Sequence, residues 1–101
     1  MSKEFETQKV EDCFDGSSIF EYKVYKEIKE EFIIKLNIFG KLYYYKEFPR
    51  PFFKIKIQNG SEILGVQGEC SFRVVYCKKC KEIYKDFFEN DLEIILNDIK
   101  K

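Results

Sequence analysis

The spacing of apolar residues changes once along this chain, near residue 76, and this change constrains the fold more than any other feature. Before it, apolar residues recur at every second position, as in Phe20, Tyr22 and Val24. After it, they recur at spacings of three and four, from Ile83 to Ile99. Period two is typical of half-buried strands, and a period of 3.6 is typical of an amphipathic helix. The chain therefore predicts a sheet followed by one C-terminal helix.

Five to six antiparallel strands are expected between residues 19 and 76. The Asn59-Gly60 pair is a strong hairpin signal, and Pro49 and Pro51 interrupt the strand pattern because proline cannot donate to a sheet ladder. Short turns favour a β-meander, since consecutive strands usually pair. The expected strands cover 19–25, 31–39, 42–45, 53–58, 62–66 and 70–76. With a helix over about 78–100, the fold class is α+β, an antiparallel meander packed against one C-terminal amphipathic helix.

The length of 101 residues suits one domain. Residues 1–18 are polar and are interpreted as an N-terminal leader, with at most one short helix or strand, before a single domain over 19–101. The start of the chain has no apolar signal region, and the apolar runs are too short to span a membrane, so we expect a cytoplasmic protein. Its cysteines are then expected to be thiols or metal ligands.

Enzyme signals are weak. The chain contains no histidine, which removes the commonest general base and the commonest metal ligand. The glycines Gly60, Gly65 and Gly68 fall at predicted hairpin turns and do not open a helix, as a phosphate-binding loop would. The sequence therefore favours a non-catalytic function.

The Cys77-Lys78-Lys79-Cys80 segment carries the most reactive chemistry, because it joins the last predicted strand to the predicted helix. Thiolates at a helix start are stabilised by the helix dipole and by nearby cations. Over about ten residues the segment resembles the strand, Cys-x-x-Cys and helix of thioredoxins and glutaredoxins. That family implies further strands and a cis-proline after the motif, and no proline follows Cys80. Neither the fold nor the activity of the family is therefore carried over.

A thiolate site for zinc or an iron–sulfur cluster is one open alternative, with Cys77, Cys80, Cys13 and Cys70 as candidate ligands. Cys70 is the weakest of them as a partner of Cys77. If 70–77 is one extended strand, the two cysteines lie about 23 Å apart at its ends. Cys70 shares the face of Phe72 and Val74 and is expected to be a small buried residue. Redox activity of the motif, or four incidental thiols, are the other interpretations.

The outer side of the predicted sheet is rich in aromatic rings and lysines. Its candidate binding residues are Tyr25, Lys35, Phe39, Lys41, Tyr43, Tyr45, Phe52, Lys54 and Lys56. Ile33 and Asn37 are assigned to the same side. An exposed patch of this kind usually marks an interface. Rings interleaved with ammonium groups are also what single-stranded nucleic acid needs.

These patterns predict a small binding or accessory module that contacts a protein partner or a second copy of itself through the aromatic face. The thiolate metal or redox protein is the first alternative, and single-stranded nucleic-acid binding is the second. With 18 basic and 18 acidic residues, the chain carries no net charge that would draw it to nucleic acid or to a membrane. A nucleic-acid partner would need a local patch of charge.

Overall fold

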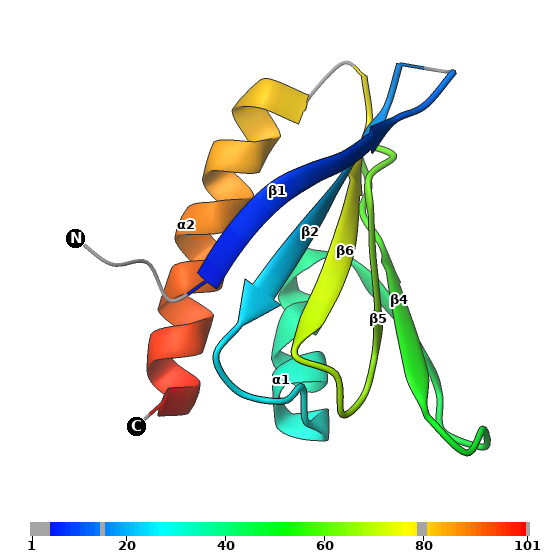
Figure 1. Ribbon diagram of the computed structural model, residues 1–101, viewed down its shortest axis with the longest axis vertical. Helices are drawn as coiled ribbons and strands as arrows, with labels where there is room; N and C mark the ends of the chain where they lie inside the picture. Colours follow the sequence, from blue (N-terminus) through cyan, green and yellow to red (C-terminus); the bar gives the residue numbers. More distant parts are fainter. Residues whose placement is uncertain (1–4, 15, 79–80, 101) are drawn as a thin grey trace.

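A six-stranded antiparallel sheet organises the protein, as seen in a computed structural model that describes residues 5–14, 16–78 and 81–100 (Figure 1). Its strands are β1 (Phe5–Asp12), β2 (Ser18–Val24), β3 (Lys41–Tyr45), β4 (Phe52–Lys56), β5 (Glu62–Val66) and β6 (Ser71–Tyr76). The spatial order is β1-β2-β6-β5-β4-β3, so β3 to β6 form a meander that returns beside β2. The expected α+β class, with an antiparallel sheet and a C-terminal helix, is confirmed.

Strand β1 belongs to the segment that the sequence assigned to a leader. It pairs with β2 from Phe5 opposite Val24 to Asp12 opposite Ser18, with a bulge between Lys9 and Glu11. β1 therefore forms one edge of the sheet, and β3 forms the other.

The strand predicted over 31–39 is wrong. These residues form helix α1 (Glu30–Lys35) and the 3₁₀ helix η1 (Leu36–Phe39). Phe32, Ile33 and Leu36 are buried together on one side, at the spacing of a helix. Acidic residues in the first turn and Lys35 in the last turn also suit the helix dipole.

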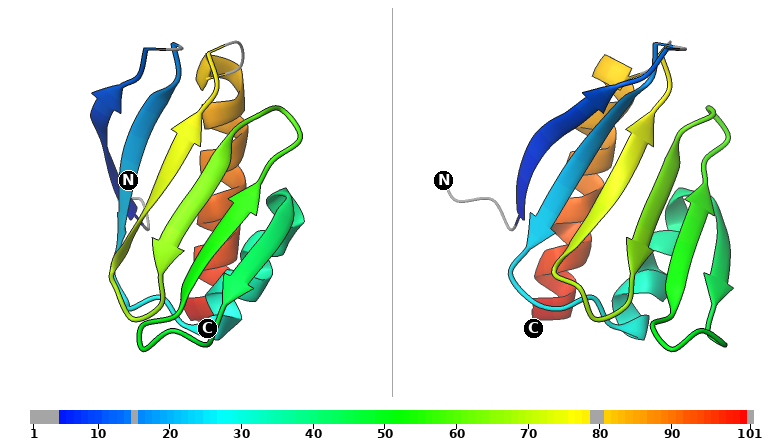
Figure 2. Two further views of the ribbon diagram at one scale, coloured as in Figure 1. Left: turned by 90° about the vertical axis from the view of Figure 1, so that its right-hand side faces the viewer. Right: turned by 45° about the vertical axis from the view of Figure 1, so that its right-hand side comes forward.

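The predicted C-terminal helix is confirmed as α2 (Lys81–Lys100). Phe88, Leu92 and Ile95 are buried on its inner side, as the apolar spacing requires. The helices α1, η1 and α2 lie on one side of the sheet, so the other side is left without a covering layer among the described residues (Figure 2).

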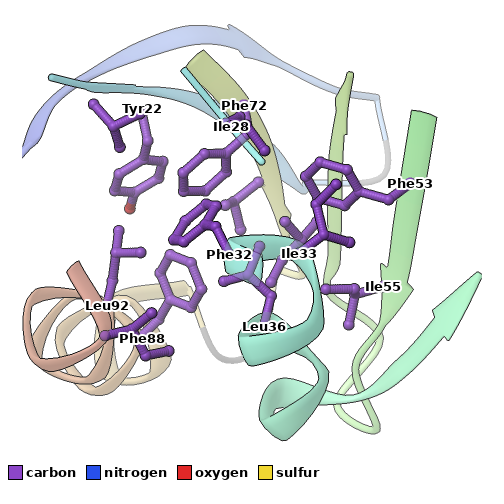
Figure 3. Packing of buried hydrophobic residues seen from close by; sticks show 14 of the residues in the cluster. Tyr22, Ile28, Phe32, Ile33, Leu36, Phe53, Ile55, Phe72, Phe88 and Leu92 are labelled. Carbon is purple, nitrogen blue, oxygen red and sulfur yellow. The ribbon is translucent and has the colours of Figure 1, made fainter. Parts of the chain in front are cut away.

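The core lies between the sheet and these helices, and aromatic rings fill much of it (Figure 3). Tyr22 stacks on Phe72 with ring centroids 5.5 Å apart and meets Phe88 of α2 edge-on at 5.6 Å. Phe32 of α1 packs against Phe72 at 5.8 Å, and Phe39 of η1 packs against Phe88 at 4.7 Å. The three helical segments are thus fixed to the sheet by one continuous aromatic cluster.

Candidate binding surfaces

The strands β3 and β4 present a row of alternating lysines and rings on the outer side of the sheet, in which Lys41 and Lys56 are exposed and the rings are half-buried. Lys41 pairs with Lys56, Tyr43 with Lys54, and Tyr45 with Phe52. The neighbours of these residues in sequence, Leu42, Tyr44, Phe53 and Ile55, pack on the core side. The period of two therefore brings six of the nine predicted binding residues onto one surface, here called the β3–β4 face: Lys41, Tyr43, Tyr45, Phe52, Lys54 and Lys56.

Within this face, the ring of Tyr43 is contacted by two ammonium groups. The Nζ atoms of Lys41 and Lys56 lie 5.4 Å and 5.8 Å from its centroid, within cation–π range. Lys54 forms an ion pair of 3.4 Å with Glu62. Lys41 and Lys56 take part in no ion pair within the described ranges, so the face carries a local positive charge.

Rings continue the face beyond the lysines. Tyr45 stacks on Phe52 at 4.6 Å, and Phe48 in the β3–β4 turn packs against Phe52 at 5.2 Å. An open hollow of about 540 Å³ adjoins them on the outer side of the sheet, lined in part by Phe52, Lys54 and Leu64. The face thus combines apolar area, cations and a concave surface beside an edge strand.

Three predicted binding residues lie away from this face. Tyr25 is exposed just after β2, on the opposite half of the sheet. Lys35 lies on the helical side, where its Nζ atom donates to Asp98 Oδ2 at 2.6 Å. Phe39 packs into the core, and Ile33, assigned to the same side, is fully buried. Lys35, Phe39 and Ile33 are misplaced because 31–39 is helical, which changes the direction of every side chain.

The candidate metal ligands are spread over both ends of the sheet. Cys13 lies in the β1–β2 turn and Cys77 directly follows β6, whereas Cys70 directly precedes β6. Cys70 is exposed, so the prediction of a buried residue is wrong. Cys80 lies outside the described residues. Among the residues that the structure describes, no group of three cysteines and carboxylates is arranged to hold a metal ion.

A second apolar surface was not anticipated from the sequence. Ile83, Phe87 and Ile94 of α2 are 71%, 65% and 66% exposed, although the spacing of Ile83 and Phe87 had suggested that they pack on the sheet. Ile94 also lines an open hollow with Ile38 of η1, which is itself exposed. The signal for this surface is the dense apolar content of α2, which exceeds what one buried side of a helix needs.

A chain of polar groups is buried between β2, β6 and α2. Tyr22 Oη donates to Glu89 Oε2 at 2.8 Å, and Tyr76 Oη lies 2.5 Å from Tyr22 Oη. Since the Tyr22 proton points to Glu89, Tyr76 is the donor to Tyr22. Lys85 Nζ lies 2.7 Å from the same Glu89 oxygen. Burial is the main cause that raises the pKa of Tyr22 and Tyr76 above the ordinary value for tyrosine.

This chain of hydrogen bonds satisfies polar groups that would otherwise be costly in the core. Tyr84 lies next to it, and burial, with the nearby Asp91 carboxylate, raises its pKa to about 12. Every phenol here is held in its neutral form at physiological pH. The cluster therefore fixes α2 to the sheet.

No protein-family model, no curated protein and no solved structure matches this chain. In the described part of the chain, no helix is both long and apolar enough to cross a membrane.

Proposed function

We propose that this chain is a non-catalytic binding module that attaches to a protein partner through the β3–β4 face. The observation that carries the proposal is the alternation of lysines with half-buried aromatic rings on the outer surface of the sheet. Tyrosine and phenylalanine supply large contact area at low cost in side-chain entropy, and they are enriched at the centres of interfaces. The lysines favour a partner with acidic residues around its apolar contacts.

The position of β3 adds a second support. β3 is hydrogen-bonded to β4 and ends the sheet within the described ranges. An edge strand can accept an extended segment of another protein by main-chain hydrogen bonds. The rings of Tyr43 and Tyr45 would then contact the side chains of that segment.

Affinity capture with matched variants tests the proposal. Tyr43→Glu places a negative charge in the middle of the face, and Tyr25→Glu makes the same change at an exposed tyrosine on the other half of the sheet. We expect partners captured by the wild-type chain to be retained by Tyr25→Glu and lost with Tyr43→Glu. Equal capture by all three chains would exclude this face as the binding surface.

A labelled single-stranded oligonucleotide distinguishes the competing nucleic-acid function in the same variants. Binding of nucleic acid through this face would weaken steeply with salt, because each contacted phosphate releases a counterion. If the wild type binds the oligonucleotide tightly, salt weakens this binding and Tyr43→Glu abolishes it, the β3–β4 face binds nucleic acid and the proposal of a protein partner is wrong.

A thiolate metal site is a second candidate, supported by the placement of two cysteines. Ser18 pairs with both Asp12 and Tyr76, so Cys13 and Cys77 follow neighbouring positions at one end of the sheet. At the usual spacing between neighbouring strands, the Cα atoms of Cys13 and Cys77 lie about 10 Å apart, on either side of β2. Elemental analysis of protein purified without chelator tests this candidate. Near-stoichiometric zinc or iron that Cys77→Ser removes and Cys70→Ser retains would support it, and metal-free protein would exclude it.

A further inference from the structure

The exposed apolar residues of α2 form a continuous stripe on the side of the helix that faces away from the sheet. Ile83, Phe87 and Ile94 are separated by four and seven residues, a spacing that places them on one side of a helix. The buried residues Phe88 and Leu92 lie on the opposite side. We call these three exposed residues the α2 stripe. Ile94 lies eleven positions after Ile83, so at a rise of 1.5 Å per residue the stripe is about 16 Å long.

Acidic residues border the α2 stripe on both sides. By helical geometry, Asp91 lies on one side of it, and Asp86 and Glu93 lie on the other. None of the three forms an ion pair in the ranges that the structure describes. The nearby Asp98 is bound by Lys35. The stripe is therefore an apolar strip with an uncompensated negative border.

The β3–β4 face has the complementary properties. Lys41 and Lys56 carry uncompensated positive charges beside the rings of Tyr43 and Tyr45. Five residues of β3 span about 14 Å, close to the length of the stripe. The chain has no net charge, yet Lys41 and Lys56 lie on the β3–β4 face, whereas Asp86, Asp91 and Glu93 lie on α2.

We propose that the α2 stripe of one copy binds the β3–β4 face of the next copy. This inference rests on the proposed binding function of that face and names a second copy of the chain as its partner. Two α2 stripes packed against each other would bring carboxylates together, and two β3–β4 faces would bring lysines together. Only the contact between unlike surfaces pairs opposite charges around an apolar centre.

The contact joins two different surfaces, so it does not close on itself as a two-fold dimer does. Helix α2 lies on one side of the sheet (Figure 2). The α2 stripe is opposite the buried residues of the helix, and the β3–β4 face is on the other side of the sheet. A pair of copies therefore keeps one free surface of each kind, and assembly continues beyond two chains. The contact is small, so the association is weak and depends on protein concentration.

Sedimentation analysis over a concentration series tests the assembly in the full chain. We expect the average mass of the wild type to rise beyond that of two chains and to fall when salt is added. Phe87→Glu blocks the α2 stripe, and Tyr43→Glu blocks the β3–β4 face. Each variant alone is expected to stay monomeric, whereas an equal mixture forms one-to-one dimers because each variant supplies the surface that the other lacks.

Phe14→Glu is the matched control, because Phe14 is an exposed phenylalanine in the β1–β2 turn, outside both surfaces. It is expected to assemble as the wild type does. Lys56→Glu is a second block of the β3–β4 face that leaves the rings in place, and circular dichroism checks the fold of every variant. A wild type that stays monomeric at all concentrations would overturn the inference, as would self-association of either blocked variant alone.

The two proposals fail separately. Monomeric wild type together with partner capture that Tyr43→Glu abolishes would overturn self-assembly and support the binding face. Capture that is indifferent to Tyr43→Glu, together with mixed dimers of the blocked variants, would support self-assembly and exclude an outside partner at this face.

Discussion

The ring of Phe53 lies directly over the backbone of Gly65, its partner across β4 and β5. A β-carbon built on Gly65 would stand 2.5 Å from Phe53 Cζ and 3.1 Å from Phe72 Cβ. Because both phenylalanines are buried, neither can move away without disturbing the core. The Phe53 ring therefore occupies the space that a side chain at residue 65 would need.

Gly65→Ala is expected to destabilise the protein by about 1–3 kcal/mol, the usual cost of overpacking a core. Urea unfolding followed by circular dichroism measures this loss as a lower midpoint. Adding Phe53→Leu removes the ring that the new methyl group meets, so the double variant is expected to lose less than the sum of the single changes. If the two losses of stability simply add in the double variant, the Phe53 ring does not limit the space at residue 65.

Gly40, between η1 and β3, is held by a different contact. A β-carbon there would stand 2.2 Å from the main-chain oxygen of Lys56, and backbone yields less readily than a side chain. Gly40→Ala is therefore expected to cost at least about as much as the change at Gly65 and to loosen the pairing of β3 with β4. Hydrogen exchange is expected to quicken over 41–56 and to stay unchanged in β1 and β2. Uniform quickening along the chain would contradict a local effect.

The sequence predicted β2 to β6 and α2 from their apolar patterns and turns, but it assigned the residues of β1 to a polar leader. Over 31–39 it misled, because apolar residues are so dense there that a period of two and a helical period both fit. The helical period is favoured there because it buries Phe32, Ile33 and Leu36 together in the core, and the core is formed by residues distant in the sequence. That error carried Lys35 and Phe39 to the wrong side of the sheet.

The surfaces were predicted unevenly for the same physical reason. Alternation placed Lys41, Tyr43 and Lys54 together, since the direction of a side chain in a strand depends only on its position. The exposure of Phe87 and Ile94 depends instead on how α2 is rotated against the sheet, which spacing alone does not decide. Cys70 alternates with buried residues but directly precedes the first residue of β6, where burial has already ended.

Glu89 accepts hydrogen bonds in the core from Tyr22 and approaches Lys85 at 2.7 Å. Glu89→Ala is expected to cost about 1–3 kcal/mol, because it leaves a buried phenol without its acceptor. Glu89→Gln keeps an acceptor of the same shape and is expected to lose clearly less. Chemical denaturation of the two variants measures the difference. Equal losses would mean that the length of the side chain matters and its hydrogen bond does not.

The raised pKa values of Tyr22 and Tyr76 predict a loss of stability in alkaline solution. The native state keeps both phenols protonated, while the unfolded chain releases their protons near the ordinary pKa of 10.0. The contribution of the two neutral phenols to the free energy of unfolding is therefore fully present below pH 10 and is lost as the pH rises above it. Each tyrosine is expected to lower the free energy of unfolding by about 1.4 kcal/mol per pH unit in that range.

Tyr76→Phe isolates one of these two contributions. It removes a titrating phenol and keeps the hydrogen bond from Tyr22 to Glu89, so the fold is expected to persist. Urea unfolding at a series of alkaline pH values is expected to show a slope that is shallower by about 1.4 kcal/mol per pH unit than in the wild type. Parallel slopes in the two proteins would mean that Tyr76 ionises as readily in the folded state as in the unfolded chain.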